Sequence, residues 1–112
     1  MKKIVTFLAV LFLYTTSVFA QKVFSVEYPN QADIKVYVVK YENQADLKVF
    51  KVRYENQAEG NEGKWFFTKY ANQAMKKIYF VKYRSDADLI IYYSTYKSDA
   101  GWRNNAKKHL MQ

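Results

Sequence analysis

The sequence predicts an all-β fold made of six copies of one strand–turn unit. A tyrosine, one variable residue, Asn-Gln or Ser-Asp, and then alanine recur six times, at intervals of 13 residues except for one of 16. Before each tyrosine, aromatic and β-branched residues recur with a period of two, which is typical of strands and not of helices. The repeated tyrosines are Tyr28, Tyr41, Tyr54, Tyr70, Tyr83 and Tyr96.

Residues 1–20 differ from the rest of the chain and have the composition of a secretory signal peptide. Lys2 and Lys3 form a basic start, residues 4–14 are almost entirely apolar, and Val18 and Ala20 provide the small residues of a cleavage site. We therefore expect cleavage after Ala20 and a secreted or periplasmic protein, with an uncleaved anchor as the alternative. The apolar run is shorter than the ~20 residues that span a bilayer. We expect no transmembrane segment in the mature chain.

Each strand is expected to run up to its tyrosine, over residues 22–28, 35–41, 48–54, 64–70, 77–83 and 90–96. The residues four and two before the tyrosine share its face of the strand. The opposite face, five and three residues before the tyrosine, is also largely apolar. Strands covered on both faces are almost continuously apolar. We expect each strand to be buried on one face and half covered on the other by the same chain.

The turn after each tyrosine combines a capping residue with an invariant small one. The side chains expected to cap the turns are Asn30, Asn43, Asn56, Asn72, Ser85 and Ser98. An alanine in every copy predicts close backbone approach: Ala32, Ala45, Ala58, Ala74, Ala87 and Ala100. The third unit inserts three residues within EGNEGK, where Gly60 and Gly63 predict a pliable loop that tolerates change or makes a contact.

The repeated V-x-Y-x-[NS]-Q-A-D unit, followed by a lysine-opened aromatic strand, resembles the septoil-knot domain, a small bacterial family of unknown function. The resemblance spans residues 22–102 and continues into AGWR at 100–103. It implies six or seven short strands wound into a seven-crossing torus knot, as one compact domain over 21–102 followed by a basic tail, 103–112. An unknotted β-repeat solenoid or small barrel is the alternative. Departures lie at Glu59 and Met75, where Asp is usual, and at Ser94-Thr95.

Charge favours anionic partners. The net charge is +8, and loss of Lys2 and Lys3 with the signal peptide lowers it to +6. Lysines open five of the strands (Lys22, Lys35, Lys48, Lys64 and Lys77), and basic residues precede four of the tyrosines (Lys40, Arg53, Lys69 and Lys82). In register, these residues form one or two basic ribbons that suit acidic glycans, membrane head groups or nucleic acid. The alternative is that they cover sheet margins and prevent edge pairing.

No residue pattern predicts catalysis, a cofactor or a metal. His109 is the one histidine and cysteine is absent, which excludes a zinc site of the usual kind, a Ser-His-Asp triad and disulfides. Asp86 and Asp88 could share a calcium ion, but the EF-hand spacing is missing and turn capping is favoured. We expect a protein that is not an enzyme.

Two functional hypotheses follow. In the first, a basic aromatic surface makes the protein a non-catalytic binding or interaction module for cell-wall or acidic glycan, monomeric, with nucleic acid disfavoured by export. Trp65, near the insertion, is the aromatic residue that we expect to matter first, although periodic aromatics can equally be core. In the second, the protein is a degradation-resistant structural or effector protein. A contiguous exposed aromatic patch favours the first hypothesis, and an evenly charged surface favours the second.

Overall fold

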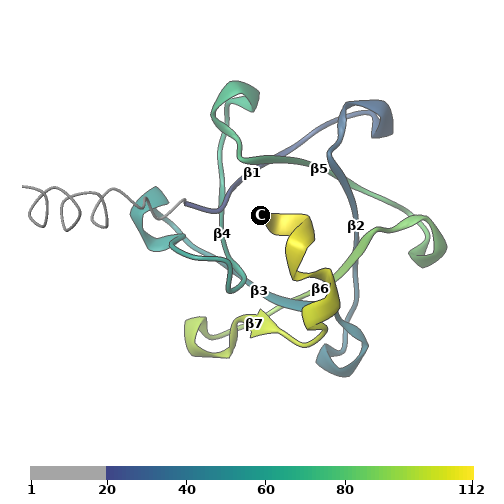
Figure 1. The fold of residues 1–112 in the computed structure, drawn as a ribbon, viewed down its shortest axis with the longest axis vertical. Coiled ribbons are helices and arrows are strands. Elements are labelled where there is room, and N and C mark those ends of the chain that lie inside the picture. Colours follow the sequence, from purple (N-terminus) through teal and green to yellow (C-terminus); the bar gives the residue numbers. More distant parts are fainter. Residues whose placement is uncertain (1–19) are drawn as a thin grey trace, which may run out of the picture.

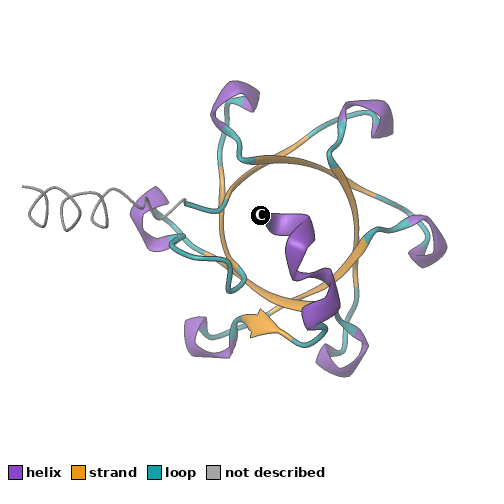
Figure 2. Ribbon diagram, viewed as in Figure 1, coloured by secondary structure: helices purple, strands orange, loops and turns teal. Residues whose placement is uncertain are grey.

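The computed structural model describes residues 20–112; the predicted signal peptide, except Ala20, lies outside this part. Six parallel strands close into a barrel, and short 3-10 turns project from it as the arms of a star (Figures 1 and 2). The strands are β1 (Lys22–Ser25), β2 (Ile34–Val38), β3 (Leu47–Lys51), β4 (Lys64–Phe67), β5 (Lys76–Phe80) and β6 (Leu89–Tyr93). A short seventh strand, β7 (Gly101–Trp102), pairs antiparallel to β3.

The arms are one-turn 3-10 helices, each starting directly after a repeated tyrosine. They are η1 (Pro29–Gln31), η2 (Glu42–Gln44), η3 (Glu55–Gln57), η4 (Ala71–Gln73), η5 (Arg84–Asp86) and η6 (Lys97–Asp99), and a longer one, η7 (Asn105–Met111), ends the chain. The strands are shorter than predicted, because the chain leaves the barrel before each tyrosine to enter the arm. The predicted capping by Asn and Ser side chains is wrong. Within residues 20–112 these side chains make no hydrogen bond, and backbone bonds such as Ala45 N–H to Glu42 O (3.1 Å) close the turns.

The chain circles the barrel twice. Around the barrel the strand order is β4-β1-β5-β2-β6-β3, and β3 pairs with β4 to close it. The first lap, β1 to β3, leaves every second position empty, and β4, β5 and β6 fill those gaps. Only the step from β3 to β4 joins neighbours, and it contains the three-residue insertion. If the chain passed over one strand position after β3, as it does at the other steps, it would arrive at the position of β1. The step to the neighbouring position, which contains the insertion, places the second lap between the strands of the first.

A constant stagger keeps the two faces of the wall in phase. The residue five before a tyrosine pairs with the residue seven before the tyrosine of the next strand, as in Val23 with Lys76 and Val36 with Leu89. Because the side-chain period of a strand is two, this stagger preserves the inward face around the whole barrel. The inward residues five before the tyrosine are all fully buried: Val23, Val36, Val49, Trp65, Ile78 and Ile91.

The outward aromatic residues, four before the tyrosine, are half-buried. They are Phe24, Tyr37, Phe50, Phe66, Tyr79 and Tyr92. This confirms the expectation of strands buried on one face and half covered on the other. Ala45 and Ala58 are also buried, and the other repeated alanines are partly so.

Aspartates after three of the alanines hold the strand register. Each carboxylate accepts a backbone N–H of a neighbouring strand at 2.8 or 2.9 Å, and its own N–H donates to the carbonyl of the same residue at 2.8 Å. The pairs are Asp33 with Lys77, Asp88 with Lys35, and Asp46 with Ile90. At Met75, where the repeat lacks Asp, only the backbone bond to Lys22 O remains.

The C-terminal segment closes the end of the barrel where the strands begin (Figure 1). Met111 of η7 is fully buried in the core, and Gln21 Nε2 donates to its carbonyl at 3.1 Å. Lys107 Nζ lies 3.4 Å from Asp46 Oδ2, beside the start of β3. Residues 103–112, taken from sequence as a basic tail, therefore contribute to the core.

The insertion is tied to this closing segment. Trp102 Nε1 donates to Asn61 O at 2.9 Å, and Asn61 Nδ2 donates to Lys108 O at 3.0 Å. Gly63 has a φ of 86°, and a Cβ there would overlap the carbonyl oxygen of Lys48. The expected contact exists, but the expected tolerance to change is wrong at Gly63, because the backbone of β3 approaches too closely.

Candidate binding surface at the open end of the barrel

The end of the barrel where the strands finish is open. The inward positions three before each tyrosine lie here: Ser25, Val38, Lys51, Phe67, Phe80 and Tyr93. The first three are exposed, so no described segment covers them. The last three are partly buried against the core. The open end thus has an aromatic floor of three side chains from the second lap, Phe67, Phe80 and Tyr93. Around the barrel they alternate with the three exposed residues of the first lap.

Lys51 lies across the aromatic floor. Its Nζ is 4.2 Å from the ring centroid of Tyr93 and 5.3 Å from that of Phe67. A cation over the face of an aromatic ring is attracted by the negative potential of that face. Burial raises the pKa of Tyr93 to about 12 from the ordinary value of 10.0, so its hydroxyl keeps its proton well into the alkaline range. Among the ion pairs of residues 20–112, none involves Lys51.

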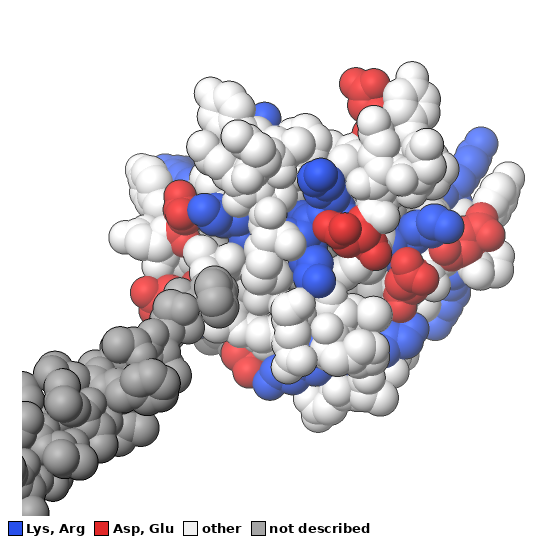
Figure 3. All heavy atoms as spheres, turned by 45° about the horizontal axis from the view of Figure 1, so that its top comes forward, with Lys and Arg blue, Asp and Glu red and all other residues white. Residues whose placement is uncertain are grey.

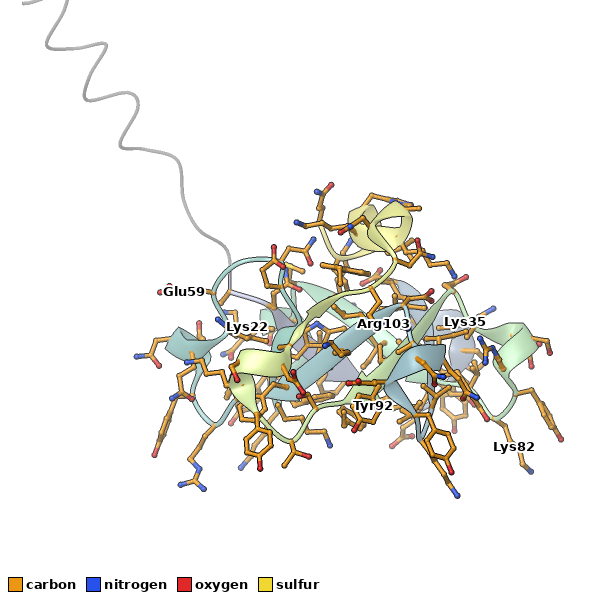
Figure 4. The ribbon with its side chains drawn as sticks, turned by 90° about the horizontal axis from the view of Figure 1, so that it is seen from below. Lys22, Lys35, Glu59, Lys82, Tyr92 and Arg103 are labelled. Atoms are coloured by element: carbon orange, nitrogen blue, oxygen red, sulfur yellow. The ribbon has the colours of Figure 1, made fainter. Side chains whose placement is uncertain are left out.

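Four cations that precede tyrosines form a basic rim at this end: Lys40, Arg53, Lys69 and Lys82. All four are exposed, and no salt bridge within residues 20–112 includes them. Figure 4 shows Lys82 pointing away from the closed end. These charges are therefore free to act on a ligand.

Two of the five lysines that open strands have carboxylate partners, whereas Lys35, Lys64 and Lys77 have none within residues 20–112. Lys22 Nζ lies 2.9 Å from Glu55, and Lys48 Nζ lies 3.9 Å from Asp99. On the flank shown in Figure 3, basic and acidic side chains are interspersed. The predicted basic residues at the strand starts are therefore partly neutralised, which fits the interpretation that they cover sheet margins.

The six repeated tyrosines are the most exposed large hydrophobic side chains of the described chain, between 59% and 68% exposed. Each directly precedes a different one of the six arms η1 to η6. Because the arms project separately around the barrel (Figure 1), the tyrosines are distributed around it as a ring. This ring is neither the contiguous aromatic patch that would favour a binding module nor the evenly charged surface that would favour a structural protein.

Two neighbouring grooves lie between the arms. One, of about 390 Å³, is lined by Pro29, Lys35, Tyr79, Lys82, Tyr83 and Asp86. The other, of about 300 Å³, is lined by Tyr37, Val38, Lys40, Tyr41, Gln44 and Arg84. Both use the tyrosine, the cation before it and the aromatic residue four before it, so both come from the same positions of the repeat. The η5 arm separates them.

The remaining sequence candidates do not gather into a site. Trp65, expected near a ligand, is fully buried; that expectation is wrong because Trp65 takes the inward position of β4. His109 is exposed on η7, and its Nδ1 lies 3.0 Å from Ala106 O. Asp88 holds strand register, whereas Asp86 lines a groove. Residues 20–112 contain no group of three or more His, Asp or Glu side chains placed to hold a metal ion.

In residues 20–112, no helix combines the length and the apolar character needed to cross a bilayer.

The fold defines a class of small parallel β-barrels in which one lap of the chain passes between the strands of the other. The chain belongs to the 7(1) septoil knot domain family, whose model matches residues 20–103. This match confirms the resemblance seen in the repeats, and with it the knotted all-β fold. Comparisons with curated proteins and with solved structures find no match. The family has no established function, so the site has to be interpreted from its own residues.

Proposed function

We propose that this protein is an exported, non-catalytic binding module for an anionic glycan, and that the open end of the barrel is its binding face. The observation that carries the proposal is the basic rim of Lys40, Arg53, Lys69 and Lys82, which is exposed and lacks carboxylate partners within residues 20–112. The exposed Glu27 occupies the same position of the first repeat, so these positions carry four positive charges against one negative. An excess of charge of one sign on one face attracts and orients an oppositely charged partner.

The aromatic residues beside the rim favour a sugar over a simple anion. Tyrosine offers a flat apolar ring with a polar hydroxyl, which suits the apolar C–H face and the hydroxyl groups of a pyranose. The hydroxyl of Tyr93 is a neutral hydrogen-bond partner at neutral pH, and burial, which raises its pKa to about 12, disfavours its deprotonation further. Export, expected from residues 1–20, makes cell-wall and extracellular acidic glycans the available polymers.

Calorimetry with polygalacturonate and with neutral dextran tests the proposal. We expect binding of the acidic polymer only, with affinity falling at least ~10-fold between about 50 and 500 mM NaCl because the contacts are exposed charges. The double variant Lys40→Gln/Lys69→Gln should lose roughly 10-fold in affinity, about 1.4 kcal/mol. The control Lys77→Gln/Lys97→Gln removes the same charge from exposed residues outside the rim. Equal losses in the two variants, or no binding of polygalacturonate, would contradict the proposal.

A second candidate function, a degradation-resistant structural or effector protein, is favoured by one observation. Basic and acidic side chains are interspersed on the face shown in Figure 3. The exposed tyrosines precede six different arms of the barrel. For this candidate function, the interleaved laps would themselves provide the resistance to degradation. A protease half-life no longer than that of an unknotted domain of equal equilibrium stability would exclude it.

A further inference from the structure

We infer that the two grooves beside η5 are consecutive subsites for one linear acidic polysaccharide chain. This inference rests on the proposed function and specifies it further. Each groove is lined by a repeated tyrosine, the lysine before it and the aromatic residue four before it. In the first groove these are Tyr83, Lys82 and Tyr79. In the second they are Tyr41, Lys40 and Tyr37. Repeated sites of equal chemistry match a ligand that itself repeats.

The size and the side chains of each groove suit one or two sugar residues. The volumes of about 390 and 300 Å³ lie at the lower end of the range of small-molecule sites. In the first groove, Lys35 and Lys82 can pair with a uronate carboxylate, and Asp86 can accept from sugar hydroxyls. Figure 4 shows Lys35 and Lys82 on the same side of the molecule. In the second groove, Lys40 and Arg84 provide the cations.

The interleaving of the two laps places the grooves side by side. The barrel order β1-β5-β2 brings the arms η1, η5 and η2 into succession, although η5 comes from the second lap and the others from the first (Figure 1). Tyr83 and Asp86 of the shared arm face one groove, and Arg84 lines the other. Arg84 Nη2 also donates to Gln44 O at 3.4 Å, which links the shared arm to η2. A polymer passing around η5 therefore meets both grooves.

Asp86 favours a polysaccharide over single-stranded nucleic acid. Tyrosines with nearby lysines also stack bases and attract phosphates. The carboxylate of Asp86 repels both polymers, because a nucleotide and a uronate each carry one negative charge per residue. It also accepts hydrogen bonds from hydroxyl groups. A 1,4-linked uronate offers two free hydroxyl groups per residue, whereas a ribonucleotide offers one and a deoxyribonucleotide none, so the carboxylate favours the polysaccharide.

The length dependence of binding tests the inference. Digalacturonate fills one groove, whereas a decamer can enter both, and the second contact then forms at a high effective concentration. We expect the decamer to bind at least ~10-fold more tightly than the dimer. Tyr41→Ala and Tyr83→Ala should each abolish most of this gain, and Tyr83→Phe, which keeps the ring, should retain most of it. Tyr54→Ala is the matched control, because Tyr54 is equally exposed and precedes η3, across the barrel from η5.

The outcomes separate this inference from the proposed function. If dimer and decamer bind equally, or if Tyr54→Ala weakens decamer binding as much as Tyr83→Ala, the paired subsites are disproved while glycan binding stands. If oligouridylate binds more tightly than the decamer, with the same sensitivity to Tyr83→Ala, the ligand class is wrong. If no oligogalacturonate or polygalacturonate binds, the proposed function fails as well. Circular dichroism of each variant verifies that these exposed substitutions leave the fold intact.

Discussion

The two ends of the barrel are made from the same repeat, yet one is sealed and the other is open. At the closed end, Ile34, Leu47 and Leu89 are buried together with Met111 of the C-terminal segment. At the open end, Val38 and Lys51 are exposed at the corresponding inward face. The repeat therefore builds the wall, and the non-repeated C-terminal segment decides which end of the barrel is free for a ligand.

The closed end also has more polar contacts between segments than the open end. At the closed end, the insertion, the strand starts and η7 are joined by hydrogen bonds from Asn61, Trp102 and Gln21. At the open end, the cations of the basic rim have no salt-bridge partner within residues 20–112. Substitutions at the closed end should therefore affect stability, and those at the open end should affect binding.

The largest loss of stability is expected for Gly63→Ala at the closed end. The substitution combines a φ of 86° with overlap between the new Cβ and the carbonyl oxygen of Lys48. We expect a loss of roughly 4 kcal/mol or more in the free energy of unfolding, measured by denaturant titration. Gly60→Ala is the control, because it has a similar φ of 74° but open space around the Cβ. It should cost only about 1–2 kcal/mol. Similar costs would mean that the approach of β3 is not tight.

Met111→Ala tests whether the C-terminal segment is part of the core. Met111 is fully buried, so its truncation leaves a cavity and should cost roughly 2–4 kcal/mol in chemical denaturation. His109→Ala, on the exposed side of the same helix, should change stability by less than about 0.5 kcal/mol. If the two variants unfold at the same denaturant concentration, η7 does not seal the barrel.

Asp33→Ala removes one of the carboxylates that hold strand register. The N–H of Lys77, now accepted at 2.8 Å by Asp33 Oδ2, would lose its partner. We expect a loss of about 1–2 kcal/mol in the free energy of unfolding. Asp86→Ala, at an exposed aspartate that makes no hydrogen bond through its side chain in the described chain, should be almost neutral. A neutral Asp33→Ala would show that the backbone ladder alone fixes the register.

High pH should destabilise the protein through Tyr93 at the open end. Burial raises its pKa to about 12 from the ordinary value of 10.0, so the folded state keeps a proton that the unfolded state releases. The stability is fully present below pH 10 and is lost as pH rises towards 12. Stability curves at high pH for the wild type and Tyr93→Phe provide the measurement. Parallel curves for the two proteins would contradict the burial of this hydroxyl.

Lys51→Ala should have the smallest effect on stability. Lys51 is exposed, and its contacts with Tyr93 and Phe67 at the open end are worth about 0.5–1 kcal/mol. A thermal unfolding midpoint close to that of the wild type is expected. A loss of stability comparable to that of Met111→Ala would mean that Lys51 closes this end of the barrel as Met111 closes the other.

The sequence predicted the wall of the barrel well, because a period of two and an invariant spacing are local properties. It identified the strands, their two covered faces, the pre-tyrosine cations and, through the resemblance, the knotted fold. It could not decide which of the two apolar faces points inward. Trp65, the aromatic residue singled out for a ligand with the core as the alternative, lies fully buried in the core.

The grooves and the closed end depend on contacts between laps, which no local pattern contains. Arg84 reaches Gln44 across 40 positions of sequence, and Gln21 reaches Met111 across 90. The tyrosines and lysines of the grooves could be recognised in the sequence because they recur at fixed positions of the repeat. Their neighbours across each groove were not, because which arms lie side by side is decided by the strand order of the closed barrel.

The most direct test of the central claim, that the open end is the binding face, is an NMR titration of the wild-type protein with polygalacturonate. We predict amide shift changes concentrated at Lys40, Tyr41, Lys82 and Tyr83, with little change in η7. Changes concentrated in η7, Asn61 or Gln21, with the rim residues unaffected, would place the ligand at the closed end and contradict the account.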